Sequence, residues 1–483
     1  MRHLLEKALQ RHLSILESLQ YEEQLRIEDL RKKLRYSSKT LLSDLPEINS
    51  YISPASIESC RGGYALQIPE NYSFDYIYSC ILKKSDRFTL LETLFFKGSQ
   101  TYIDLADLLF TSESTLKRLL SSFNPLLRPL GFHVETRPIR ISGDGGAIIQ
   151  FFVAYFSEKY SNPLDAFPVS EQAAIKQLLV FWREKNHLTL PSPDTNLLSL
   201  WLLTSYHRKM ELDLLESTPD MPSIRGVENL EVENTDILSV LRTAFSDTNS
   251  EERIRYVIEN LFPYGFVLSP SLIEESYANF PDNRQVYQCA VDLIHALSSY
   301  FNLSVQNYDN FVLDLFNLFN LARSLKLPRH ILNDKARTFF EKADEQEKAL
   351  YYVLEELLED LRLPGYAWNQ SDYYELFYIL ITHWTDFLPN IQKRRKKIRI
   401  GLYYDTDIEH SRYLKKQLEF LHGNHTEVRI LDDFAEKNRH ELDLILTNRQ
   451  GLTSTEYDVM CTGLMLTSQD WYRIEKRRSQ PGP

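Results

Sequence analysis

Hydroxyl and cationic side chains follow one another in one short segment of the chain, and their order suits contact with a charged polymer. The side chains concerned are those of Ser112, Glu113, Ser114, Thr115, Lys117, Arg118 and Ser121. On a helix, such hydroxyls can reach base edges in the major groove of a duplex, while Lys and Arg reach phosphates. The pattern therefore predicts a DNA-contacting helix that begins after Ser112.

A related pattern occurs earlier in the chain. Residues 30–41 align with residues 105–116, with Leu, Leu, Ser, Thr and Leu in common. At the same shift in numbering, the extended stretch 64–66 aligns with 139–141. We call this shift, which carries residue 30 onto residue 105, the repeat offset. Because the match covers two kinds of element, it indicates a duplicated unit. The corresponding contact positions of the first copy are Ser37, Ser38, Lys39, Thr40 and Ser43.

Both sets of side chains need a helix, a short turn and a second helix to position them. In each copy the second helix begins at a Ser, whose hydroxyl can cap free backbone N–H groups. Alternating residues around Arg61-Gly62-Gly63 and around Arg137-Pro138 then predict a two-stranded hairpin, or wing, in each copy. We expect Arg61, Arg137 and Arg140 to lie near the phosphate backbone.

Each copy also has a purely structural explanation. Ser-capped amphipathic helix pairs occur throughout helical proteins, and the basic cluster at residues 31–39 is equally typical of a solvated face. The first copy has Leu42 and Asp44 where the second has Lys117 and Leu119, so its outer face is predicted to be less basic. The second copy is therefore the stronger candidate.

Composition limits the class of protein. The chain has 483 residues, of which 43% are apolar and 25% charged, as expected for several globular domains in series. Four widely spaced Cys suggest neither a metal knuckle nor a disulfide framework. Charges within residues 1–20 argue against a signal peptide, and no run of about 18 uncharged apolar residues follows. We expect a cytoplasmic protein without membrane contact, metal or cofactor.

Charge is unevenly distributed along the chain. Residues 1–142 contain 19 Lys+Arg and 17 Asp+Glu, whereas the remainder contains 36 and 50. Since phosphate repels an acidic surface, we expect only the near-neutral N-terminal part to face nucleic acid.

Helical periodicity dominates residues 147–388, with breaks at about 216–231 and 263–270. The predicted helices are 147–160, 170–186, 194–209, 232–247, 283–301, 308–325, 345–362 and 370–388. Their many aromatic residues are expected to form a core or a dimer face rather than to stack on bases.

A different pattern follows the basic run at residues 393–397, which is more typical of a solvated linker than of a phosphate site. Apolar stretches at 398–404, 427–431 and 442–447 and a helix at 409–422 predict a small parallel α/β sheet.

Taken in order, these elements resemble the Mga/AtxA family of virulence and carbon-responsive regulators of Gram-positive bacteria, over nearly the whole chain. The resemblance is carried mainly by Ser112–Arg118 and by the strand Ile398–Tyr404. It implies a mostly α, multidomain protein. The implied domains are winged helix–turn–helix domains at 1–70 and 71–145, helical-bundle PRD-like domains (phosphotransferase-system regulation domains) at 146–275 and 276–395, and a small EIIB-like α/β domain at 396–478.

The resemblance also implies regulation by histidine phosphorylation, for which the candidates are His207, His295 and His383. For each of them a packing role is the alternative. EIIB enzymes carry a phosphoryl-accepting Cys after their first strand, where this chain has Asp405-Thr406-Asp407. We therefore expect a scaffold or dimerisation role for the last domain.

The sequence favours a DNA-binding transcriptional regulator of the global or virulence type. The resemblance implies a homodimer or higher oligomer, tuned by the sugar phosphotransferase system through its phosphocarrier protein. Two alternatives stay open: a PRD-type antiterminator, which binds RNA through a small β-rich domain, and a component of the phosphotransferase system itself. No Walker A, G-x-G-x-x-G or HExxH motif occurs, so an enzyme is not expected.

Overall fold

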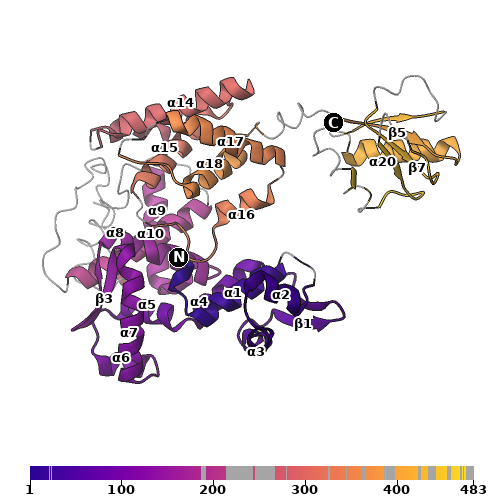
Figure 1. The fold of residues 1–483 in the computed structure, drawn as a ribbon. Coiled ribbons are helices and arrows are strands. Elements are labelled where there is room, and N and C mark those ends of the chain that lie inside the picture. Colours follow the sequence, from indigo (N-terminus) through magenta and orange to yellow (C-terminus); the bar gives the residue numbers. More distant parts are fainter. Residues whose placement is uncertain are drawn as a thin grey trace. The chain divides into compact units, whose positions relative to one another are not determined.

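The structure is a computed structural model of the 483-residue chain, and it divides into two compact units (Figure 1). The first contains residues 1–294, 312–342 and 355–376, and the second contains residues 295–311, 343–354 and 377–483. Each unit is described by itself. The residues described are 1–20, 22, 24–185, 192–213, 243–244, 267–278, 280–324, 327–343, 345–361, 363, 365–385, 387, 397–422, 426–432, 442–453, 458–467, 470 and 473–474.

The N-terminal part of the first unit consists of short helices and two hairpins. Its elements are η1 (Arg2–Leu4), α1 (Lys7–Gln20), α2 (Ile27–Leu34), α3 (Ser38–Asn49), β1 (Ser56–Cys60), β2 (Gly63–Gln67), α4 (Phe74–Lys84), α5 (Asp86–Lys97), α6 (Tyr102–Leu108), α7 (Glu113–Leu127), η2 (Arg128–Leu130), β3 (Phe132–Thr136) and β4 (Ile139–Gly143). Both predicted helix pairs and both predicted antiparallel hairpins are present, so these expectations are confirmed.

The duplication seen in the sequence extends to the structure. The repeat offset carries the first residues of α2 and α3 onto those of α6 and α7. An isolated antiparallel bridge joins Leu25 to Tyr64 in the first copy, and the bridge at the same offset joins Gln100 to Ile139 in the second. The buried faces of α3 and α7 match as well. The buried apolar residues of α3 are Leu41, Leu45 and Ile48, and those at the corresponding positions of α7 are Leu116, Leu120 and Phe123.

The aromatic residues of α8 (Gly145–Lys159) form a core, as one of the two sequence alternatives proposed. The ring of Phe88 on α5 stacks on that of Tyr155, with 5.3 Å between ring centroids, and the ring of Phe95 lies 4.2 Å from that of Phe152. Phe152 and Tyr155 are fully buried, and such packing stabilises chiefly by removing aromatic surface from water. Helix α8 thereby attaches the second copy to the helices that follow.

The helical body has a helix in each predicted range that is described, although the last one ends at His383 rather than at residue 388. Its elements are η3 (Pro163–Ala166), α9 (Val169–Lys185), α10 (Ser192–Asp213), η5 (Pro270–Leu272), α13 (Ile273–Ser276), α14 (Asn283–Phe301), α15 (Tyr308–Ser324), α16 (Lys335–Lys342), α17 (Glu345–Asp360) and α18 (Gln370–His383). The short helices η3, η5, α13 and α16 were not predicted. Most of the predicted helix 232–247, the loop 216–231 and the basic run 393–397 lie outside the described residues, apart from 243–244 and Lys397.

The last part of the second unit is a parallel sheet of four strands in the order β6-β5-β7-β8. The strands are β5 (Ile398–Tyr403), β6 (Thr426–Ile430), β7 (Leu444–Thr447) and β8 (Asp458–Cys461), and the helix α20 (Ile408–His422) connects β5 to β6. The expected α/β sheet is confirmed. Strand β8 was missed because its sequence, Asp-Val-Met-Cys, lacks the continuous β-branched and leucine run that marks β7.

Two further observations concern the chain as a whole. In the part that the structure describes, no helix combines the length and the apolar character needed to cross a bilayer. The four cysteines, Cys60, Cys80, Cys289 and Cys461, are free, as their spacing in the sequence suggested.

Candidate nucleic-acid interface

The second helix of the second copy, α7, begins where the sequence predicts. The Ser112 hydroxyl accepts a hydrogen bond from the backbone N–H of Thr115 at 3.1 Å, which satisfies one donor of the first turn. Leu116, Leu120 and Phe123 are buried against the rest of the unit. Since these residues recur every three or four positions, the opposite face of the helix is left in solvent.

That opposite face carries the predicted contact side chains. All of them are exposed: Ser112, Glu113, Ser114, Thr115, Lys117, Arg118 and Ser121. The two cations among them differ in their ion pairs and other contacts with neighbouring side chains. Lys117 Nζ lies 3.2 Å from Glu113 Oε2 and 4.9 Å from the ring centroid of Tyr102, whereas Arg118 has no ion pair or side-chain hydrogen bond within the described ranges. Arg118 is thus the better placed of the two for an outside phosphate.

The second wing is fastened directly to α7. The side chain of Asn124 donates a hydrogen bond to the carbonyl oxygen of Val134 and accepts one from the Val134 N–H, both at 2.8 Å. In the hairpin, Arg140 faces Glu135 and donates to its carboxylate at 2.7 Å, and this bond holds the pKa of Glu135 below its usual value. Arg137 stands exposed at the tip. Arg137 is therefore the accessible cation of this wing, and Arg140 is already paired.

The first copy repeats this arrangement. Ser37 caps α3 by accepting the N–H of Thr40 at 3.1 Å, and Asn49 forms the same two-bond contact with Ile57 (2.9 and 2.7 Å) that Asn124 forms with Val134. The repeat offset carries Asn49 onto Asn124, so the clamp is part of the duplicated unit. The remaining contact positions of this copy divide by exposure: Lys39, Ser43 and Arg61 are exposed, whereas Ser38 and Thr40 are half-buried.

The expectation that Asp44 weakens the outer face of α3 is wrong. Asp44 is buried, and both of its oxygens accept hydrogen bonds from the Arg11 guanidinium. Burial raises the pKa of this carboxyl, but the hydrogen bonds and charge of Arg11 outweigh burial and hold the pKa below its usual value. The sequence pattern misplaced Asp44 because a helix seen alone does not show that α1 covers this side of it.

A cluster beside Asp44 has the residue types of a metal site. Ligand atoms of His12, Asp44 and Glu47 lie within 4.8 Å of one another, and His12 is fully buried. Tyr51, however, lies 3.0 Å from His12 Nδ1, and the Asp44 carboxylate is already neutralised by Arg11. Since a cation would have to displace that guanidinium, the arrangement fits a buried ion pair better than a metal centre.

The three candidate regulatory histidines differ in exposure. His207 is mostly buried among aromatic rings, and its Nε2 lies 2.8 Å from Glu171 Oε2, which matches the packing alternative. His295 on α14 and His383 on α18 are exposed, and each has a tyrosine ring nearby, with centroids 6.4 Å apart: Tyr308 for His295 and Tyr378 for His383. His383 also accepts a hydrogen bond at its backbone oxygen from Asn307, at 2.9 Å.

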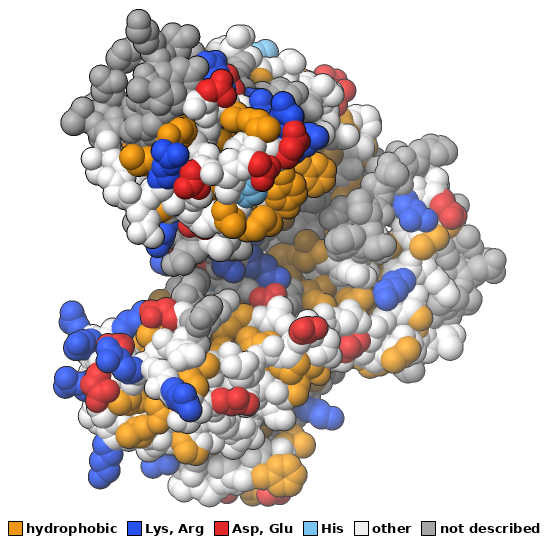
Figure 2. All heavy atoms as spheres, turned by 90° about the vertical axis from the view of Figure 1, so that its right-hand side faces the viewer, with side chains coloured by type: hydrophobic (Ala, Val, Ile, Leu, Met, Phe, Trp, Pro, Cys, Tyr) orange, Lys and Arg blue, Asp and Glu red, His pale blue; other side chains and the backbone are white. Residues whose placement is uncertain are grey.

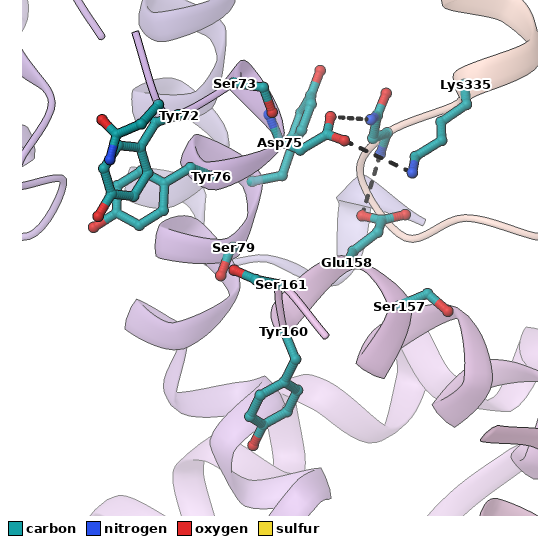
Figure 3. A pocket seen from close by; sticks show the side chains of 13 residues that line it. Tyr72, Ser73, Asp75, Tyr76, Ser79, Ser157, Glu158, Tyr160, Ser161 and Lys335 are labelled. Carbon is teal, nitrogen blue, oxygen red and sulfur yellow. Dashed lines mark hydrogen bonds and ion pairs between the residues drawn. The ribbon is translucent and has the colours of Figure 1, made fainter. Parts of the chain in front are cut away.

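A pocket of about 340 Å³ lies where α4, the end of α8 and residues 333–335 meet. Figure 3 shows Asp75, Glu158 and Lys335 pointing toward one another there. Glu158 accepts hydrogen bonds from the backbone N–H groups of Ile331, Leu332 and Asn333 at 2.6, 2.8 and 3.3 Å; burial nevertheless raises its pKa. Asp75 bonds to the Asn333 side chain at 2.9 Å. These polar groups are hydrogen-bonded to one another. Their bonds connect α4 and α8 to residues 331–335.

Cationic side chains are not spread evenly over the surface. In the view of Figure 2, Lys and Arg side chains gather at one edge, with neutral and apolar side chains over much of the rest. The exposed cations of the two helix–turn–helix copies include Arg26, Arg31, Lys32, Lys33, Arg35, Lys39, Arg61, Lys117, Arg118, Arg128 and Arg137.

Sequence reasoning missed the two asparagine clamps and the bridges beside the hairpins. The signal was present, because Asn49 and Asn124 are related by the same repeat offset as the matched helices. Extending the comparison of the two copies as far as Asn49 would have shown that both copies place an Asn at this position, although not which strand residue it contacts.

Comparison with known proteins extends this description. The family described as the Mga helix-turn-helix domain matches residues 70–156, which include α6, α7 and the second hairpin. The chain is 22% identical to a putative trans-acting regulator of Streptococcus pneumoniae over 96% of this chain and 93% of the relative. It is 29% identical to the capsule synthesis positive regulator AcpA of Bacillus anthracis over 39% and 40%, and 23% identical to AcpB of the same organism over 65% and 67%.

Proposed function

We propose, from the confirmed resemblance of this chain to the Mga family of regulators, that it is a transcriptional regulator that binds duplex DNA through α7 and α3 and their wings. One observation carries the proposal: a Ser-capped helix buries an apolar face and presents hydroxyls, Lys117 and Arg118 outward, the last without a charged partner among the described residues. This is the combination by which a helix in the major groove reaches bases and phosphates.

Recognition relies largely on phosphate contacts and on DNA shape. Five exposed cations occupy the contact positions: Lys39, Arg61, Lys117, Arg118 and Arg137. If most of them reach phosphates, the logarithm of the affinity falls with the logarithm of the salt concentration with a slope of about −3 to −4. Base-specific side chains are few, so differences between sequences come partly from how easily the DNA deforms.

Regulation acts through the helical body. His295 and His383 are accessible to a phosphocarrier protein, and a phosphoryl group on either one adds about −1.5 to −2 charges to its helix. His207 is the weaker acceptor, because it first has to leave Glu171. The proposal includes assembly as a homodimer or higher oligomer in the cytoplasm, and a scaffold role for the C-terminal sheet. In that sheet, Asp405, Thr406 and Asp407 follow β5 in place of a reactive Cys.

A gel-shift salt series with labelled duplex tests the proposal, with unlabelled hairpin RNA and unlabelled duplex as competitors. We expect binding that weakens steeply with salt and that duplex displaces better than RNA. Preferential displacement by the hairpin RNA supports the antiterminator alternative instead. Duplex binding that does not depend on salt contradicts the proposal.

A further inference from the structure

The turn between α6 and α7 carries an exposed surface, the turn patch, that DNA binding does not explain. Its members are Ile103, Asp104, Asp107, Leu108 and Phe110. Phe110 is 98% exposed, and Ile103 and Leu108 are 63% and 44% exposed. On α6, positions 103, 104, 107 and 108 share one face, and Phe110 follows directly after it. Three apolar side chains in solvent on so small a segment favour contact with another macromolecule.

Comparison of the two copies shows that this surface is not required by the fold. The buried residues agree at the repeat offset, as Leu30 and Leu105 do. The chain also takes the left-handed conformation at the same place, with φ of 59° at Arg35 and 50° at Phe110. The exposed positions differ instead, apart from Asp29, which corresponds to Asp104. At the positions of the turn patch, the first copy has Glu28, Asp29, Lys32, Lys33 and Arg35.

Compared with the first copy, the turn patch has apolar or acidic side chains at three positions where the first copy has cations. Where the first copy has Lys32, Lys33 and Arg35, the second has Asp107, Leu108 and Phe110. The turn patch therefore carries two carboxylates and no cation, so a phosphate backbone is repelled there. Its complement is a protein surface with apolar side chains surrounded by Lys and Arg.

The place of the turn patch along the chain indicates where that protein stands. The turn patch ends at Phe110, just before the Ser112 cap of α7, so its occupant stands beside the DNA that α7 contacts. We propose that the turn patch binds a basic and apolar surface of RNA polymerase, with Phe110 as the central contact. This inference rests on the proposed function, because it places the protein at a promoter. A buried aromatic residue at the centre of an interface commonly dominates its affinity.

Two independent variants test the turn patch in the full-length protein. Phe110→Asn removes the ring and keeps a residue that tolerates positive φ. Asp104→Lys combined with Asp107→Lys reverses the charge at two exposed positions. Val169→Ser is the matched control, since Val169 is also exposed, at 79%, and lies outside the turn patch.

Each protein is titrated, without DNA, against purified bacterial RNA polymerase holoenzyme by biolayer interferometry. Gel shifts with duplex and sedimentation velocity are measured in parallel. We expect both turn-patch variants to bind polymerase at least tenfold more weakly than wild type and Val169→Ser, with unchanged duplex affinity and unchanged mass.

The other outcomes overturn the inference in distinct ways. A wild-type protein that does not bind polymerase, or variants that bind it as wild type does, exclude polymerase as the occupant. Loss of duplex affinity in Phe110→Asn means that the turn patch contacts DNA. A change in mass means that it contacts a second copy of the chain. Because polymerase binding is measured without DNA, failure of the proposed DNA-binding function shows only in the wild-type gel shift.

Discussion

Asn124 on α7 holds Val134 on β3 by two hydrogen bonds of 2.8 Å, one in each direction. The helix proposed to enter the major groove and the wing proposed to lie on the backbone are therefore joined by one side chain. The pair Asn49 and Ile57 repeats this relationship in the first copy.

Replacing Asn124 by Ala is expected to destabilise the protein and to weaken DNA binding. The change leaves the N–H and C=O of Val134 without their partner, at a cost of about 1–3 kcal/mol where such groups are buried. Thermal unfolding followed by circular dichroism measures the stability, and gel shifts measure the affinity. Asn71→Ala, at an exposed position before α4, is the control. An unchanged midpoint and affinity in Asn124→Ala means that the clamp is dispensable.

Arg118→Ala is expected to weaken duplex binding more than Lys117→Ala does. Lys117 is shared with Glu113 and Tyr102, whereas Arg118 has no such neighbour within the described residues. Losing one phosphate contact lowers the steepness of the salt dependence by about 0.9. Gel shifts at several salt concentrations give this slope, with Lys83→Ala on α4 as a surface control. Equal effects of the two substitutions contradict the assignment.

Two substitutions of Ser112, the residue that caps α7, distinguish an effect on stability from an effect on DNA binding. Ser112→Ala is expected to cost about 1 kcal/mol of stability, because the Thr115 N–H loses its acceptor. Ser112→Asp keeps a good cap and restores stability, but it places a negative charge where phosphate is expected. Denaturant unfolding and gel shifts on both variants distinguish these effects. Wild-type affinity in Ser112→Asp shows that the start of α7 lies away from DNA.

The buried group around His12 predicts a loss of stability in acid. Burial lowers the pKa of His12, although Asp44 and Glu47 raise it and Arg11 lowers it further. A base whose pKa is lowered by folding stays neutral in the folded protein. Its contribution to the free energy of unfolding is therefore complete above the unfolded-state pKa of about 6.5, and it is lost as the pH falls below that value. Unfolding between pH 7.5 and 5 is expected to show this loss, and His12→Gln to reduce it. The same slope in both proteins excludes His12 as its origin.

Asp44 is expected to cause a second loss of stability, at lower pH than His12. Its lowered pKa means that its stabilising contribution is complete above about pH 4, near the unfolded pKa, and is lost as the pH falls through the lower folded value. The lowered pKa values of His3, His330 and the Met1 amino group also cause loss of stability as the pH falls from 7 to 5, so the part due to His12 is the difference between wild type and His12→Gln. Further loss below pH 4 includes Asp44.

The sequence predicts those elements whose pattern is strictly local. Ser37 and Ser112 mark the starts of α3 and α7, and the glycines after Arg61 mark the first hairpin. Helices α4 and α5 were not predicted individually, although Ser73 and Ser85 cap them.

Features that depend on distant parts of the chain could not be predicted. Asp44 looks exposed until α1 supplies Arg11, and Arg140 looks free until the hairpin register places it opposite Glu135. The resemblance supplied the candidate histidines, and only the structure separates the mostly buried His207 from the exposed His295 and His383.

The central claim, that the outer face of α7 contacts duplex DNA, is tested most directly by photocrosslinking. A benzophenone amino acid replaces Ser114 on α7 in one protein and Ser157, an exposed residue of α8, in another. Both are irradiated with labelled duplex at low salt. The account predicts a crosslink from position 114 that excess unlabelled duplex and added salt abolish, and none from position 157. A bound complex that crosslinks equally from both positions, or only from position 157, contradicts it.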